Sequence, residues 1–173
     1  MEYLAHIADD GRVQTVSEHL HGTGELAAGF AAPFGASDEA RAAGLLHDIG
    51  KYSAAFQQRI RGSAVSVDHS TAGAQEARNR RDLPAALAIA GHHGGIPDCG
   101  NLNDAADDTT LQGRLKRKLP TYDEWQREIA PPSAKPPAWA LSDSTTAAFY
   151  TRMLYSCLVA VSYTHLTLPT KLE

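Results

Sequence analysis

The chain has 173 residues, a formal net charge of −4 at pH 7, 43% hydrophobic residues and 21% charged residues. This length predicts one domain with a sizeable hydrophobic core. The acidic balance excludes a general attraction to polyanions, so nucleic-acid binding requires a local basic patch or bound cations. Two cysteines make no disulfide framework, no apolar run is long enough to span a membrane, and we find no signal peptide. We therefore expect a cytoplasmic protein with no membrane partner.

The first part of the chain predicts an extended segment followed by two helices. Residues 1–14 are expected to be extended. A helix is expected to begin near Thr15, because TVSE is a capping-box pattern in which Glu18 reaches back to the N-cap. A second helix is expected from Ser37. Its apolar positions recur with a helical period: Ala42, Ala43, Leu45, Leu46 and Ile49.

The middle of the chain predicts three shorter helices and a loop. Ser53 can cap a third helix, and either Asp68 or Ser70 can cap a fourth. Pro84 opens a fifth helix, which ends at paired glycines. Residues 96–108 are rich in Asp, Asn and Gly and are expected to form a polar loop.

The last part predicts two further helices, a connector and a final helix. Residues 109–119 and 122–129 are expected to be helical, and the proline-rich residues 130–139 are expected to connect them to a last helix over 142–160. The apolar positions of that last helix are Phe149, Met153, Leu154, Cys157 and Leu158. No alternation is long enough to predict a sheet. The expected fold class is therefore all-α, a helical bundle with a metal site at its centre.

The final stretch, VSYTHLTLPTKLE, has a different character. It is rich in threonine and departs from the helical pattern, and its closing residues resemble a cloning scar. We interpret residues 1–160 as the domain, truncated at its last helix, and residues 161–173 as a non-native tail.

Four groups of possible metal ligands lie at or near the ends of the expected helices. They are His19, the pair at 47–48, the pair at 68–69 and the pair at 92–93. Each alone is more often a core histidine or a helix cap than a ligand. Two adjacent imidazoles before two glycines, however, suit a shared ion better than an apolar core. Together the four groups predict a metal site between facing helices.

The residue types favour transition metals. Asp48 can bridge two cations through its two carboxylate oxygens, and imidazoles supply neutral nitrogen ligands. Such a mixed shell suits Mn, Fe, Co, Ni or Zn better than Ca or Mg. Two ions about 3.5–4 Å apart can clamp a phosphodiester and activate a water. The chain has no phosphate loop of the Walker type and no GxSxG elbow.

Five blocks of sequence carry a resemblance to a known family. They are EHLHGT, LLHDIGKYSAAFQ, DHSTAGA, IAGHHGGIPD and RMLYSCLV, in that order. HDIGK is the signature of the HD-domain metal-dependent phosphohydrolases. The five blocks together resemble the HD nuclease of type I CRISPR interference, an antiviral defence, over about residues 3–159. The resemblance implies an endonuclease that cleaves single-stranded DNA, with a CRISPR helicase domain or subunit and the Cascade surveillance complex as partners.

The resemblance also implies two divalent ions and their ligands. One ion would be held by His19, His47, Asp48 and a late Asp, and the other by Asp48, His69, His92 and His93. Ala160 stands where the family has the late Asp. Binding of the first ion and nuclease activity are therefore expected to be weakened, and His165 is not expected to replace the missing Asp.

Other residues near these groups have competing interpretations. Asp48 and Lys51 are the expected catalytic residues; Lys51 can meet a phosphate or orient a ligand, or it can be a solvated surface lysine. His6 is interpreted as structural or solvated, and His21 as structural. Asp68 is expected to cap a helix or to support His69.

Three functions remain open at this level. The first is the CRISPR-type nuclease. The second is a general HD phosphohydrolase that acts on nucleotides, and the third is an inactive fragment that only docks to a partner. Two basic groups, at 78–81 and 114–118, are interpreted as solvated helix faces, with a DNA-guiding groove wall as the alternative.

Overall fold

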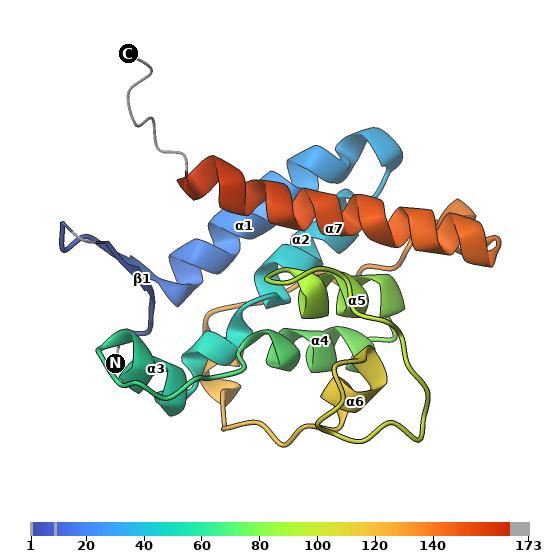
Figure 1. Ribbon diagram of the computed structural model, residues 1–173. Helices are drawn as coiled ribbons and strands as arrows, with labels where there is room; N and C mark the ends of the chain where they lie inside the picture. Colours follow the sequence, from blue (N-terminus) through green and yellow to red (C-terminus); the bar gives the residue numbers. More distant parts are fainter. Residues whose placement is uncertain (1, 9, 167–173) are drawn as a thin grey trace, which may run out of the picture.

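The computed structural model describes residues 2–8 and 10–166, with side chains as far as Val161. It is mostly helical, and α7 lies across α1, α2 and α5 (Figure 1). The strands are β1 (Leu4–Ile7) and β2 (Val13–Thr15), and the α-helices are α1 (Val16–Ala31), α2 (Ser37–Leu46), α3 (Ala54–Ile60), α4 (Ser70–Asn79), α5 (Leu83–Gly91), α6 (Leu111–Leu115) and α7 (Ser144–Leu166). Short 3₁₀ turns are η1 (Ala32–Phe34), η2 (Ile49–Tyr52), η3 (Asp123–Arg127) and η4 (Ala138–Leu141). The expected all-α bundle is confirmed.

The extended N-terminal segment forms a small hairpin, which was not expected. Strand β1 pairs antiparallel with β2, and Ile7 lies opposite Val13. Strands of four and three residues are too short to show a clear alternation of apolar and polar residues. They are stabilised by pairing with each other across the turn, which a local sequence pattern does not reveal. The predicted capping box of α1 is confirmed: Thr15 Oγ1 accepts from the Glu18 backbone N–H at 3.1 Å, and a Glu18 carboxylate oxygen accepts from the Thr15 N–H at 2.9 Å.

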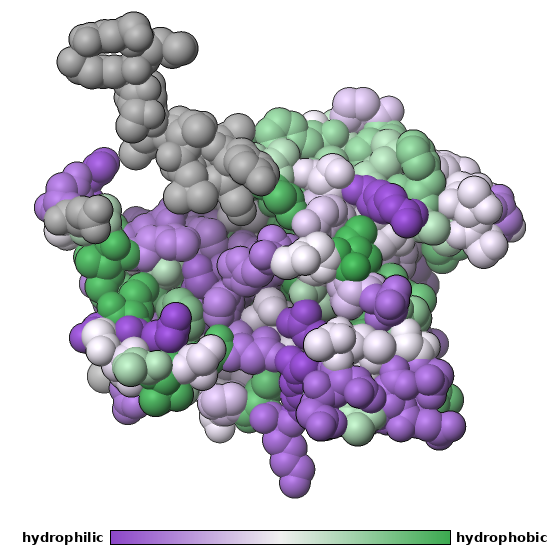
Figure 2. Space-filling model, in the orientation of Figure 1, coloured by the Kyte–Doolittle hydropathy of each residue, from purple (hydrophilic) through white to green (hydrophobic). Residues whose placement is uncertain are grey.

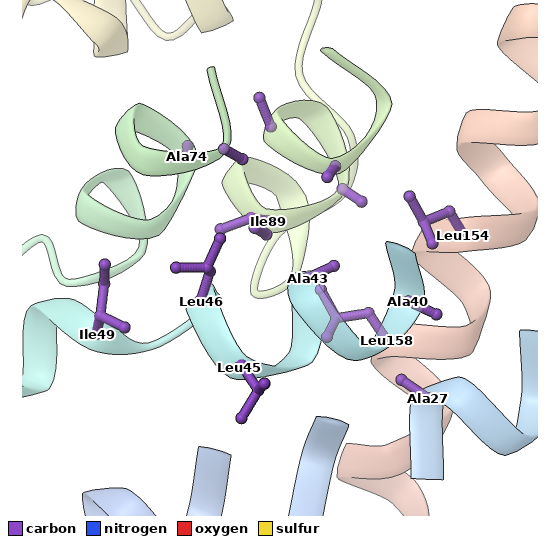
Figure 3. Packing of buried hydrophobic residues seen from close by; sticks show 14 of the residues in the cluster. Ala27, Ala40, Ala43, Leu45, Leu46, Ile49, Ala74, Ile89, Leu154 and Leu158 are labelled. Carbon is purple, nitrogen blue, oxygen red and sulfur yellow. The ribbon is translucent and has the colours of Figure 1, made fainter. Parts of the chain in front are cut away.

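Helix α2 is the centre of the core. It begins at Ser37 as predicted, and all of its expected apolar positions are buried. It packs on α1 through small residues, since a Cβ atom added to Gly44 would lie 2.6 Å from the Gly24 Cα. Only glycine allows the two backbones to come this close. Leucine and isoleucine side chains from α2, α5 and α7 then fill the space on the other side of α2 (Figure 3).

The last helix differs from its prediction in two ways. Phe149 was expected in the core but is 59% exposed, and Tyr150 is buried in its place, because the buried stripe continues through Leu154, Leu158 and Val161. Helix α7 also continues to Leu166, so the expectation that the helical pattern stops at 160 is wrong for residues 161–166. Residues 167–173 lie outside the described residues, and the non-native origin of 161–173 stays a prediction.

Two other expected helices are shorter than predicted. Residues 109–119 contain only the five-residue α6, and residues 122–129 contain the 3₁₀ turn η3. Tertiary hydrogen bonds take the place of helical ones here. The Gln75 amide nitrogen donates to the carbonyl oxygens of Leu115 at 3.2 Å and Arg117 at 2.9 Å, which ties this segment to α4. None of the described helices combines the length and apolar character needed to cross a lipid bilayer.

A buried carboxyl pair connects α2, the start of α5 and α7. Glu39 is 1% exposed and accepts a hydrogen bond from the Tyr150 hydroxyl, and Asp82 is 6% exposed and caps α5 through the Ala85 N–H at 2.9 Å. Burial, followed by the nearby Asp82 carboxylate, raises the pKa of Glu39 to about 8. Glu39 therefore keeps its proton in the folded state at neutral pH.

This pair predicts a pH dependence of stability. Between the unfolded pKa of Glu39, near 4.5, and the folded value of about 8, the unfolded chain loses a proton that the folded chain keeps, so rising pH favours unfolding. Glu39→Gln removes this effect. The free energy of unfolding of the variant, relative to that of the original chain, should therefore rise by up to roughly 4 kcal/mol from pH 5 to pH 8. Urea unfolding at a series of pH values measures the difference.

The comparison between the two proteins isolates the Glu39–Asp82 pair, because the rest of the chain is the same in both. Glu2→Gln, at an exposed position, is the matched control and should show no such gain. A Glu39→Gln difference that is the same at pH 5 and pH 8 would contradict a protonated Glu39.

Candidate metal centre

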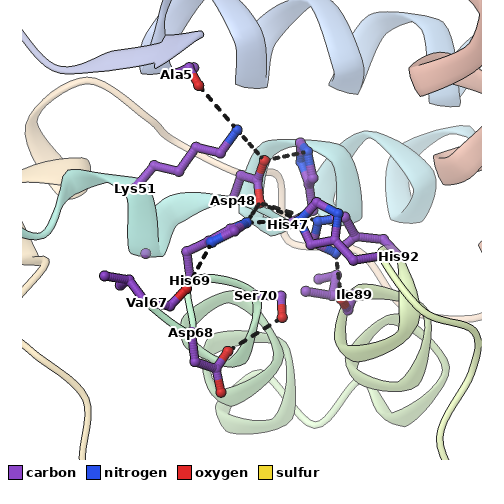
Figure 4. A network of polar contacts seen from close by, with 12 residues as sticks. Ala5, His47, Asp48, Lys51, Val67, Asp68, His69, Ser70, Ile89 and His92 are labelled. Carbon is purple, nitrogen blue, oxygen red and sulfur yellow. Dashed lines mark hydrogen bonds and ion pairs between the residues drawn. The ribbon is translucent and has the colours of Figure 1, made fainter. Parts of the chain in front are cut away.

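The predicted ligands come from four separate segments that meet in the middle of the fold. His19 lies in the first turns of α1, and the 47–48 pair lies between α2 and η2. His69 immediately precedes α4, and the 92–93 pair immediately follows α5. Figure 4 shows the side chains of His47, His69, His92 and Lys51 converging on Asp48. The structure brings together all six residues that the sequence nominated as metal ligands.

A close backbone contact allows two of these segments to meet. The turn η2 passes directly against the residue before α4, and a Cβ atom added to Gly50 would lie 2.3 Å from the His69 carbonyl oxygen and 2.7 Å from its Cα. Any larger residue would push His69 away from Asp48. The glycine of HDIGK is therefore required by packing.

The two oxygens of Asp48 face two different groups of side chains. Asp48 is 2% exposed. Its Oδ2 lies 3.0 Å from His19 Nε2, 3.3 Å from His47 Nε2 and 2.9 Å from Lys51 Nζ.

The second oxygen faces the other histidines. Asp48 Oδ1 lies 3.2 Å from His92 Nε2, 3.4 Å from His69 Nε2 and 4.0 Å from His93 Nε2. The ligand atoms of each group, Asp48 included, lie within 4.8 Å of one another. One carboxylate thus joins two possible metal-binding groups.

Backbone carbonyls orient three of the imidazoles. His47 Nδ1 lies 2.7 Å from the Gly44 carbonyl oxygen, and His92 Nδ1 lies 2.7 Å from the Ile89 carbonyl oxygen. His69 Nδ1 lies 3.3 Å from the carbonyl oxygen of Val67. A carbonyl only accepts, so Nδ1 carries the proton in each case and the Nε2 lone pair points toward Asp48. Metal-binding histidines are commonly held in this way.

Two atoms at the centre have no hydrogen-bond partner within the described residues. They are Asp48 Oδ1 and His92 Nε2, both buried. A buried polar atom without a partner costs roughly 1–3 kcal/mol, so such atoms usually serve a function. A carboxylate oxygen and an imidazole lone pair are both electron-pair donors, so they cannot form a hydrogen bond with each other. A cation between them can accept electron pairs from both. The donor set fits a divalent metal.

The protonation states also suit metal binding. Burial lowers the pKa of His19 to about 3 and also lowers the pKa of His69, so these two rings are neutral at pH 7. Burial alone would raise the pKa of Asp48, but the neighbouring His47 ring and Lys51 ammonium hold it well below its usual value. The centre therefore offers an ionised carboxylate beside the neutral rings of His19 and His69, the forms that bind metals.

The neighbouring residues resolve several open interpretations. Lys51 is 4% exposed and paired with Asp48, so the solvated surface alternative is wrong. His21 is exposed and faces the Glu128 carbonyl oxygen at 3.4 Å, away from the centre. Asp68 accepts from the Thr71 N–H at the start of α4 and pairs with Arg117, so it acts as a cap.

His6, interpreted from the sequence as structural or solvated, is exposed but lies closer to the centre than the sequence indicated. Its Nε2 lies 3.4 Å from Lys51 Nζ, and its ring packs edge-on against His19 with centroids 4.8 Å apart. A single histidine in a short strand carries no local signal. Only the hairpin, which carries β1 to the side of η2, places it there.

Within the described side chains, no second carboxylate stands near the centre in the place expected for a late Asp. Among the described side chains, Asp48 supplies the only carboxylate of either ligand group. Ala160 lies in α7, and the His165 side chain falls outside the described part of the chain.

A buried carboxylate that joins two groups of imidazoles, set between helices, forms a candidate metal-binding centre. A comparison with protein-family models finds the HD domain over residues 16–124, more than half of the chain, and the chain therefore belongs to this family. Membership indicates metal-dependent phosphohydrolase activity. A search of curated proteins finds no match.

The centre predicts which histidines bind metal. His19→Ala and His69→Ala should each weaken Mn²⁺ or Zn²⁺ binding at least tenfold, because each removes a ligand from one of the two groups. His21→Ala, in the same helix as His19 but exposed, is the matched control and should leave binding unchanged. Isothermal titration calorimetry of metal-stripped protein measures the affinities. Equal losses for His19→Ala and His21→Ala would contradict this assignment.

Proposed function

We propose that this chain is a metal-dependent nuclease that cleaves single-stranded DNA in type I CRISPR interference. The observation that carries the proposal is the position of Asp48, whose two oxygens each face a separate group of imidazoles. In a phosphodiester hydrolase that uses two metal ions, a carboxylate between the ions can bind both of them. The five blocks of family-like sequence extend the proposal to DNA as the substrate, and to a helicase and the Cascade complex as partners in the cytoplasm.

The centre is proposed to hold two divalent transition-metal ions. His19, His47 and Asp48 would hold one, and Asp48, His69, His92 and His93 would hold the other. The chemistry that such ions supply is Lewis-acid activation of water and neutralisation of phosphate charge.

The chain's own residues prepare the centre for a phosphate. Backbone carbonyls hold the imidazoles in one orientation, so little rearrangement is needed when a ligand arrives. Lys51 holds Asp48 Oδ2 in place at 2.9 Å and places a positive charge at the centre. We propose that Lys51 keeps the carboxylate oriented and attracts the phosphate anion.

The substrate distinguishes this proposal from a general HD phosphohydrolase that acts on nucleotides. With Mn²⁺, the chain should cleave single-stranded DNA and leave mononucleotides intact, and EDTA should stop cleavage. Asp48→Asn should lower the cleavage rate at least a hundredfold, because it removes the charge shared by both groups. Gel assays of DNA and phosphate-release assays of mononucleotides, run in parallel, measure both activities.

Two controls accompany this experiment. Asp48→Asn keeps an oxygen near Lys51, and its circular dichroism should match that of the original chain. His21→Ala should cleave normally. Hydrolysis of mononucleotides without DNA cleavage would contradict the nuclease proposal and would support the general phosphohydrolase.

The missing late Asp predicts unequal metal sites. The His19–His47 group has two imidazoles and a carboxylate oxygen already paired with Lys51, whereas the other group has three imidazoles and an unpaired oxygen. We expect one tightly bound ion per chain and weak cleavage. Ala160→Asp should raise the metal count toward two and increase cleavage about tenfold or more. Elemental analysis and the cleavage assay measure the two effects.

Ser156→Asp is the matched control, because it adds the same charge to an exposed position one turn earlier in α7. It should change neither quantity. Two tightly bound ions in the chain as it stands would show that position 160 is not needed for the first site.

A further inference from the structure

A hollow of about 520 Å³ lies directly beside the metal centre. Its walls come from β1, η2, α3 and the turn after α3, and it reaches the centre at Lys51, His69 and His93. We call it the β1–α3 hollow. Its size falls in the range of ligand-binding pockets, about 300–1,000 Å³. In Figure 2, apolar (green) and polar (purple) surface meet over β1 and α3 at the left edge of the view.

The lining of the β1–α3 hollow suits a nucleotide. Ile7, Phe56 and Ile60 supply apolar surface, and the exposed Arg59 supplies positive charge, whereas the charge of the buried Lys51 is paired with Asp48. None of the residues that line it is acidic, although the chain as a whole carries a net charge of −4. Apolar surface beside cations is what a base and its phosphate require together.

Arg59 is placed to reach a phosphate. It is exposed at the rim of the hollow, and its Nη1 donates to the Val65 carbonyl oxygen at 3.0 Å, which steadies the guanidinium. Its Nε and Nη2 make no hydrogen bond within the described residues. Arginine presents a rigid fork of donors that matches phosphate oxygens.

A second hollow also borders His93. It has a volume of about 470 Å³ and is lined by the glycines after His93 together with Asp98, Thr110 and Arg114. The two hollows share His93, whose side chain is 59% exposed. A single nucleotide would occupy only one of them, whereas a polynucleotide can pass across the metal centre from one to the other.

We propose that the β1–α3 hollow is a nucleotide subsite, in which Arg59 binds the phosphate next to the one that is cleaved. This inference rests on the proposed nuclease function and describes where the DNA strand binds. The two residues that it assigns to DNA binding, Arg59 and Ile7, are not among the proposed metal ligands.

The test measures binding of fluorescent single-stranded DNA of ten nucleotides by anisotropy in EDTA, so that cleavage does not interfere. Arg59→Gln should weaken binding about fivefold. It should also reduce the slope of log K against log salt by about 0.7, as expected for one lost phosphate contact on a single strand. Arg59→Lys, which keeps the charge, should restore part of the affinity. Arg78→Gln, an exposed arginine of α4 outside both hollows, is the control for charge.

A second pair of variants does not depend on Arg59. Ile7→Glu places a negative charge in the β1–α3 hollow and should weaken binding at least fivefold. Val13→Glu places the same charge on the paired residue of β2, outside the hollow, and should have little effect. Both positions are exposed, at 45% and 53%, so both variants should fold alike. The KM for DNA cleavage with Mn²⁺ should rise for Arg59→Gln and Ile7→Glu only.

The outcomes separate the subsite from the proposed function. If the original chain cleaves DNA but neither Arg59→Gln nor Ile7→Glu changes Kd, salt slope or KM, the subsite is overturned and the nuclease stands. Equal losses for Ile7→Glu and Val13→Glu would overturn it as well, because they would show only a general charge effect. If the original chain neither binds nor cleaves DNA, both are overturned.

Discussion

The buried carboxylate of Asp48 is the interaction on which the rest of the centre depends. It is 2% exposed and lies within about 4 Å of five histidines and one lysine. Removing a carboxylate from water is unfavourable unless charges or hydrogen bonds replace the water. Lys51 and His19 do this for Oδ2, whereas Oδ1 has no donor within the described residues. The asymmetry is unfavourable for the isolated chain, and a cation at Oδ1 would remove it.

The helices around Asp48 explain how so many ligands reach one point. Three of the ligand segments lie at helix ends, where the backbone groups do not all form hydrogen bonds within the helix. The Gly44 contact brings α1 to α2 and therefore His19 to His47, and the Gly50 contact brings His69 to Asp48. Small residues at two backbone contacts thus set the distances between ligands that are far apart in the chain.

Polar groups elsewhere in the core have a different role. Glu39 and Asp82 are also buried carboxyl groups. Glu39 is stabilised by keeping its proton and by the hydrogen bond from the Tyr150 hydroxyl, whereas Asp48 is surrounded by imidazoles and Lys51. The basic residues Arg114 and Arg117 likewise engage Asp68 and backbone carbonyls. These contacts hold both guanidinium groups against the fold, so this group is not simply a solvated helix face. The hollow beside β1 and α3, whose lining has no acidic residue, is the proposed subsite for the strand.

The sequence by itself determined the helical class, the capping of α1 at Thr15, the start of α2 at Ser37 and the six candidate ligands. These features depend on local hydrogen bonds, on helical periodicity and on residue chemistry, which are all visible in short segments. It misplaced Phe149 by one position, because one residue turns a helix by about 100° and the partners of α7 are distant in the chain.

Only the tertiary structure decided the environment of each ligand. That Lys51 is buried, that His6 reaches His19, and that the two oxygens of Asp48 face different histidines all follow from packing between segments dozens of residues apart. Such contacts depend on how closely α1, α2, α4 and α5 approach one another, and no local pattern encodes those distances.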